Sequence, residues 1–184
     1  SKFNTKNVTS MREMFMSVNL TSIDVSNFDT SNVTDMEGMF YNSNAESLDG
    51  IENFDTSKVT DMSLMFVQSN VNSRLDLSSF DTSSVTDMGS MFNQTKSKYI
   101  DLSSFSTSFV TDMENMFCYA SVEKLDISNF DTSNVTTMSQ MFYSIKVSNL
   151  DLSNFDTSKV IRMDAMFAYS KALILDLSSF DTSN

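Results

Sequence analysis

One motif repeats along the whole chain at an almost constant interval. At one position of the repeat, a Phe that is followed two residues later by Thr occurs eight times, and successive copies are 25 or 26 residues apart. These residues are Phe3, Phe28, Phe54, Phe80, Phe105, Phe130, Phe155 and Phe180. A fixed period of about 20–50 residues is typical of solenoids, in which each unit packs only against its neighbours. We therefore expect a stack of coils rather than a globule around one central core.

The unit reads L-D-L-S-N-F-D-T-S-N-V-T-D-M-x-x-M-F, followed by about seven variable residues. All 15 Met except Met16 fall in its two Met positions, and all 16 Phe except Phe109 fall in its two Phe positions. The unusual composition of the chain is therefore a consequence of the repeat.

The pattern within one unit predicts its secondary structure. Apolar and polar residues alternate over residues 75–80, which predicts a short strand with one buried face. Over residues 85–92 the apolar residues are spaced as on one face of two helical turns, and the D-T-S-N sequence between the two segments favours a turn and a helix N-cap. We therefore expect an α/β repeat solenoid, with about 25 residues per coil, a parallel β-sheet on one face and short helices on the other.

Residues 1–184 are interpreted as a single array of seven strand-bearing repeats that begins and ends within a repeat, and as an excerpt of a longer protein. The register slips twice. We expect a bulge in the strand near Gly50 and a longer return loop over residues 67–74.

Charge and composition exclude several classes of function. Lys and Arg number 12 and Asp and Glu 24, so the net charge is −12, which disfavours nucleic acid as a partner. The chain has no His and one Cys, which removes the commonest general base and rules out an internal disulfide or a cysteine zinc site. No apolar run has the length of a bilayer span, so we expect no membrane insertion by this segment.

An Asp occupies the same position in every predicted strand, on the solvent side of the sheet. The residues are Asp24, Asp49, Asp76, Asp101, Asp126, Asp151 and Asp176. They form either an acidic stripe that binds cations or a basic partner, or a solubilising row that discourages edge pairing. No resident cofactor is expected, and the candidates for Ca²⁺ ligands are Asp76, Asp101, Asp126 and Asp151. Neighbouring Asp pairs also mimic a retaining glycosidase, but the pair recurs along the array, so we expect no enzyme.

Two other sets of repeated residues, the Met pairs and the Thr after the turn, are interpreted as structural. The Met pairs, such as Met88 and Met91, have the spacing of a core face and a Phe beside them, which favours packing over Cu(I) binding. A Thr follows the turn in every repeat: Thr5, Thr30, Thr56, Thr82, Thr107, Thr132, Thr157 and Thr182. We expect a hydrogen-bonded hydroxyl ladder; an ice-binding face is the alternative, disfavoured by the charged neighbours and the turn position.

The repeat at residues 150–160, followed by Met163 and by Met166 and Phe167, resembles the BspA-like leucine-rich repeats of bacterial surface proteins, and the resemblance covers essentially the whole chain. It implies a leucine-rich-repeat-like solenoid with the sheet on its concave face. It also implies an extracellular location, on a surface lipoprotein or a cell-wall protein, and a role in adhesion.

The functional hypothesis is a non-enzymatic cell-surface scaffold that contacts a host or neighbouring-cell component, either protein or glycan. The alternative is a structural stalk or spacer without a ligand of its own. Candidate ligand-binding residues are the strand carboxylates and the aromatic departures from the repeat: Asp24, Asp76, Asp101, Asp126, Asp151, Asp176, Phe109, Tyr119, Tyr143 and Tyr169.

Overall fold

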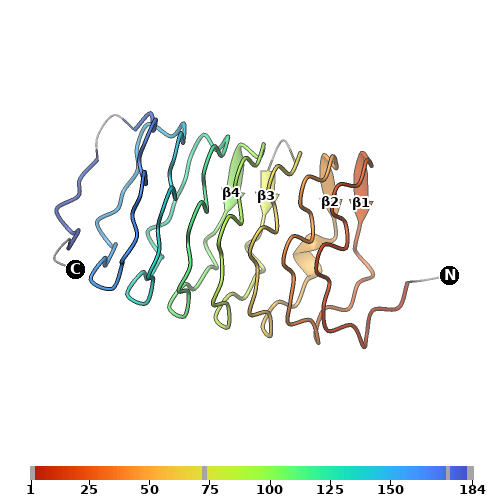
Figure 1. Cartoon of the computed structure of the whole chain (residues 1–184). Coiled ribbons are helices and arrows are strands. Elements are labelled where there is room, and N and C mark those ends of the chain that lie inside the picture. The colour runs from red at the N-terminus through yellow and green to blue at the C-terminus, as the bar shows by residue number, and fades with distance from the viewer. Residues whose placement is uncertain (1–2, 72–73, 173–174, 182–184) are drawn as a thin grey trace.

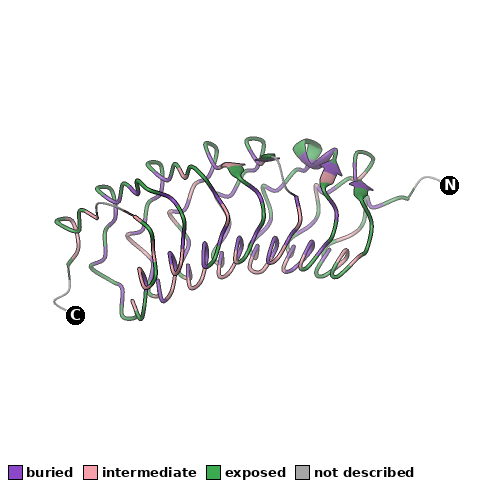
Figure 2. Cartoon of the chain, turned by 90° about the horizontal axis from the view of Figure 1, so that it is seen from above, coloured by how far each residue is buried: buried purple, intermediate pink, exposed green. Residues whose placement is uncertain are grey.

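The computed structural model describes residues 3–71, 74–172 and 175–181, and it has the architecture of a solenoid. Figure 1 shows the coils side by side in one row, with the two termini at opposite ends, and Figure 2 shows the same row from above. Each coil lies against the one before it and the one after it, as the repeat predicts.

Short parallel strands occupy the same place in successive coils. Asp24 lies opposite Asp49 and Asp76 opposite Asp101, so equivalent residues stand beside one another as expected. Within the residues that the structure describes, the strands form two pairs and not one long sheet of seven strands. The pairs are β1 (Ser22–Asp24) with β2 (Ser47–Asp49), and β3 (Arg74–Asp76) with β4 (Tyr99–Asp101).

The Met segments are not helices, and this part of the predicted fold is wrong. Within the described residues the one helical segment is the 3-10 turn η1 (Ile51–Asn53). In the coil that contains Met88, the amide of Met91 donates to the carbonyl of Met88 at 3.2 Å and closes a tight turn. The amide of the next residue, Phe92, donates instead to the carbonyl of Met116 in the following coil at 2.9 Å. Turns within a coil therefore alternate with bonds between coils.

Left-handed residues explain why the turns never join into a helix. In each coil the residues two and six positions after the first Met have a positive φ, as at Ser90 (57°) and Gln94 (55°). An L-residue in this conformation costs about 1–2 kcal/mol. The bonds to the next coil offset this cost. Only one of these positions is a glycine, Gly38 (59°), so the sequence carries no glycine signal that would reveal the turns.

The apolar side chains form columns inside the coils, which confirms the core interpretation of the Met pairs. Phe92 stacks between Phe66 and Phe117, with ring centroids 5.7 and 5.5 Å apart. Ten Met side chains are completely buried: Met36, Met39, Met62, Met65, Met88, Met91, Met113, Met116, Met138 and Met141. The packing gain is shared between coils, so each coil depends on its neighbours.

The Thr column that follows the turn is buried, and its hydroxyls bond to the backbone of the next coil and not to one another. The hydroxyl of Thr132 donates to the carbonyl of Asp156 at 2.9 Å and accepts the amide of the same residue at 2.8 Å. A buried column cannot meet ice, so that alternative does not apply to Thr5 through Thr157. Thr182 lies outside the described residues.

The first register slip falls after a strand and not within it. β2 is intact and in register with β1, and the inserted residue is absorbed in η1, so the expected strand bulge is wrong. Gly50 has φ of 90°, and a Cβ at this position would lie 2.2 Å from the Cα of Ser26. Only glycine permits this approach of the two coils. The second slip, in residues 67–74, includes Asn72 and Ser73, which lie outside the described residues.

Candidate functional site

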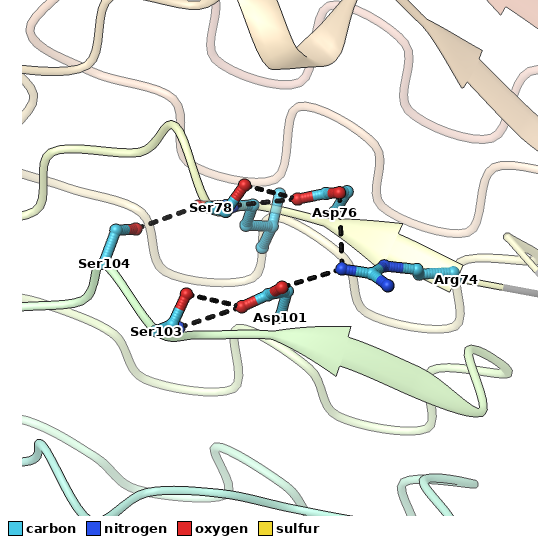
Figure 3. Close-up of polar contacts among 7 residues, drawn as sticks. Arg74, Asp76, Ser78, Asp101, Ser103 and Ser104 are labelled. Carbon is cyan, nitrogen blue, oxygen red and sulfur yellow. Dashed lines mark hydrogen bonds and ion pairs between the residues drawn. The ribbon is translucent and has the colours of Figure 1, made fainter.

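The strand carboxylates have a structural task in addition to their charge. Oδ1 of Asp101 accepts the amide of Ser103 at 3.1 Å and its hydroxyl at 2.7 Å, which closes the turn that follows β4 (Figure 3). Asp126 makes the same pair of bonds with Ser128, at 3.2 and 2.7 Å. The D-x-S pattern of the repeat is therefore a turn motif.

These bonds keep the carboxylates charged. The hydroxyl and amide of Ser103 lower the pKa of Asp101 below its ordinary value of 3.8, and those of Ser128 do the same for Asp126. At Asp151 the Ser153 bonds lower the pKa, although the neighbouring charge of Asp176 opposes the shift. The serine bonds thus favour the ionised form of Asp101, Asp126 and Asp151.

The basic side chain of Arg74 lies within this row of carboxylates. The guanidinium of Arg74 is 2.8 Å from Oδ2 of Asp101 and 3.5 Å from Oδ2 of Asp76, so it bridges carboxylates of two successive coils (Figure 3). Arg74 and Asp76 share one face of β3 because they are two residues apart, and Asp101 belongs to the adjacent strand. This arrangement shows how the strand face accommodates a guanidinium.

Beyond Arg74 the strand face is hollowed by two adjoining cavities of about 350 and 390 Å³. We call them together the strand-face groove. Both are lined by Tyr99, Ile100, Asp126 and Ser128. The remaining lining residues are Arg74, Asp101, Leu102, Ser103 and Asn129 in the first cavity, and Lys124, Leu125, Ile127, Asn149 and Asp151 in the second. The groove is lined by apolar residues and by three carboxylates, Asp101, Asp126 and Asp151, which we call the rim. Its volume is within the range of ligand pockets.

The groove lies where the apolar residues of the strand positions are incompletely buried. Ile100 and Leu125 are only partly buried, whereas Leu75, in the equivalent position of β3, is buried. Tyr99 forms a wall that is 49% exposed, and its hydroxyl donates to Oε2 of Glu123 at 3.0 Å. That bond raises the pKa of Tyr99, so the phenol remains neutral.

The repeat predicts the carboxylates of the groove but not its other charged and aromatic lining residues. Asp101, Asp126 and Asp151 were candidates, whereas Arg74, Tyr99 and Lys124 were not. These three occupy one repeat position, which is Ser22 in β1 and Ser47 in β2. The larger side chains at these three places, where β1 and β2 carry serine, would have been the signal.

The other strand candidates, Asp24, Asp76 and Asp176, do not line the two cavities. Asp24 and Asp176 cap their turns through the amides of Ser26 and Ser178, at 3.0 and 2.9 Å.

The aromatic candidates lie elsewhere on the surface. Tyr143 is between Tyr119 and Tyr169, with ring centroids 5.1 and 5.3 Å away, and its contact with Tyr119 raises its pKa to about 12. Phe109 is 63% exposed. None of the four lines the groove, so the structure gathers the Tyr candidates into one patch and leaves Phe109 apart from the groove.

The structure does not group the Ca²⁺ candidates. In the described part of the chain, the one set of three acidic side chains whose oxygens lie within 4.8 Å of one another is Asp35, Glu37 and Asp61. Glu37 is already paired with Arg12. This second acidic column lies outside the groove and continues to Asp87, whose pKa is raised by burial.

A comparison with family models decides where the chain belongs. The model described as "Mycoplasma protein of unknown function, DUF285" matches residues 1–49, 42–124 and 119–184. The chain is a member of this family. The three DUF285 matches cover the array from end to end, in agreement with the repeat. No curated protein and no solved structure matches the chain. Among the described residues of this DUF285 protein, no helix is long and apolar enough to cross a membrane.

Proposed function

We propose that this DUF285 protein is a non-enzymatic repeat scaffold of a bacterial cell surface, which binds a partner through the strand-face groove. The observation that carries the proposal is the groove itself. Its lining combines two partly buried apolar residues, Ile100 and Leu125, with the rim carboxylates Asp101, Asp126 and Asp151. Such a combination of apolar area with a few polar groups is typical of binding sites.

The carboxylates of the groove support binding over catalysis. A glycosidase needs one carboxyl that holds a proton at working pH beside one that is ionised. The serine partners of Asp101, Asp126 and Asp151 all lower the pKa of these carboxyls, which favours the ionised form in each of them and supports binding over proton donation.

The surface location and the adhesive role rest on the resemblance of the repeat to BspA-like leucine-rich repeats. The rigid array adds support, because buried Phe and Met columns run through consecutive coils and hold the groove in a fixed position. Treating intact cells that make the protein with an external protease tests the location. Loss of the chain without lysis is the expected result, and full protection would contradict it.

Adhesion is tested with the purified chain on host or neighbouring cells. A variant with Asp101, Asp126 and Asp151 all changed to Asn removes the charge of the rim, and an Asp24→Asn, Asp49→Asn, Asp176→Asn variant removes the same charge outside the groove. We expect the first variant to lose binding and the second to retain it. If the wild-type chain does not bind, the spacer hypothesis is favoured. If both variants bind equally, the groove is not the site.

A further inference from the structure

The proposed function leaves the chemistry of the partner open, and the geometry points to an arginine side chain of a partner protein, seated over Tyr99 between Asp101 and Asp126. This inference rests on the proposed function and names the group that enters the groove.

The surroundings of Arg74 already show how this strand face binds a guanidinium. Its guanidinium lies between the carboxylates of its own coil and the next coil, at 3.5 and 2.8 Å. The repeat carries the same pair of carboxylates one coil further on, because Tyr99 is paired with Arg74 on one side and with Lys124 on the other. There the position of the arginine is occupied by Tyr99, which supplies no positive charge. The first cavity of the groove lies at this place, lined by Tyr99, Asp101 and Asp126.

Tyr99 favours a guanidinium over a simple ammonium. A planar guanidinium can stack on an aromatic ring and still donate to two carboxylates, whereas an ammonium is a strongly hydrated point charge. Ile100 also lines the first cavity and offers apolar surface to the methylene stem of an arginine.

The charges of the groove predict how binding can be tuned. Its lining residues include three carboxylates and two basic groups, Arg74 and Lys124. Arg74 is already paired with Asp76 and Asp101, so it adds little repulsion. Lys124 interacts with Asp126 and competes with an incoming cation. Removing Lys124 should therefore strengthen binding, which a general loss of folding cannot imitate.

The test is a titration of the isotope-labelled 184-residue chain with an acetylated and amidated Gly-Arg-Gly-Arg-Gly peptide, at low ionic strength. Matched peptides carry citrulline, the neutral isostere, or lysine. We expect amide shifts at Tyr99, Asp101 and Lys124 to Ser128, tightest binding for arginine, and none for citrulline.

Four variants complete the test. Tyr99→Arg fills the seat from within, and it should weaken binding by about fivefold or more. Asp126→Asn should weaken it by about threefold and Lys124→Gln should strengthen it by a similar factor. Tyr169→Arg, which makes the same change outside the groove, should leave affinity unchanged.

Binding to Tyr99→Arg at wild-type affinity would overturn the inference, as would shifts spread evenly over all strand carboxylates. If cells bind the wild-type chain through the groove but the arginine peptide neither binds nor competes, the proposed function stands and the partner has other chemistry, such as a neutral glycan.

Discussion

The hydroxyl of Thr107 is bonded twice to Asp131 in the next coil: it donates to the carbonyl at 2.8 Å and accepts the amide at 2.8 Å. Thr107 is buried, and the same pair of bonds recurs along the column. The Thr107 side chain thus provides a hydrogen-bond partner for both backbone groups of Asp131, the amide and the carbonyl.

Replacing this hydroxyl should be costly. Thr107→Val keeps the shape but removes the hydroxyl that bonds to both the amide and the carbonyl of Asp131, so the free energy of unfolding should fall by about 2 kcal/mol. Chemical denaturation measures the change. The control is Thr111→Val, because Thr111 is exposed and its hydroxyl makes one long bond, 3.3 Å, to Thr86. Equal losses in the two variants would contradict the role of the buried column.

The Phe column predicts a second contrast. Phe92 is buried between two rings, so Phe92→Ala should lower the free energy of unfolding by about 3–5 kcal/mol. Phe109 is exposed and stands outside the column, so Phe109→Ala should change it by less than about 0.5 kcal/mol. Thermal unfolding of both variants checks this, and a reversed order would refute the assigned core.

The carboxylates should titrate in two groups. Asp101 and Asp126 have pKa values lowered by their serine partners, and Asp87 has a pKa raised by burial and by the charges of Asp112 and Asp61. A lowered pKa in the folded state contributes stability above the ordinary value of 3.8, and this stability is lost as the pH falls through the folded value. For Asp87 the sign is opposite: its ionisation opposes folding, so the protein gains stability as Asp87 is protonated.

Carbon-detected titration of the carboxyl groups measures these pKa values. Ser128→Ala should raise the pKa of Asp126 toward 3.8, because the hydroxyl bond is its largest cause, and should leave Asp101 unchanged. An unaltered Asp126 would show that the turn bond does not set its pKa.

The glycines offer a backbone test. Gly50→Ala should cost about 3 kcal/mol, because it combines a left-handed φ with a Cβ placed 2.2 Å from the backbone of Ser26. In Gly89→Ala the nearest atom is the side-chain oxygen of Asp87, at 3.1 Å, so the loss should be below about 1 kcal/mol. Denaturation curves compare the two, and a tolerated Gly50→Ala would mean that the two coils do not meet there.

The sequence predicts the columns well and the local backbone poorly. The 25-residue period fixes which residues stand beside one another, because like side chains pack best on like in a stacked array. The spacing of Met88 and Met91 fits a helix, but it fits a closed turn equally well. The left-handed residues that separate the two cases are ordinary ones such as Ser90 and Gln94.

The candidate site, too, is predicted only in part by the sequence. The rim carboxylates follow from the repeat, since every coil supplies one. The groove does not, because it depends on the incomplete cover of Ile100 and Leu125 and on the side chain of Tyr99. These are properties of three particular coils and not of the motif.

The central claim is that amides of alternate residues in one coil donate to carbonyls of the next coil. Scalar couplings across these hydrogen bonds test it most directly. We predict that the amide of Phe92 couples to the carbonyl of Met116 and that the amide of Ser90 couples to the carbonyl of Glu114, both in the next coil. A coupling from Phe92 to the carbonyl of Met88 would instead show an α-helix in this segment and would contradict the stacked coils on which the groove depends.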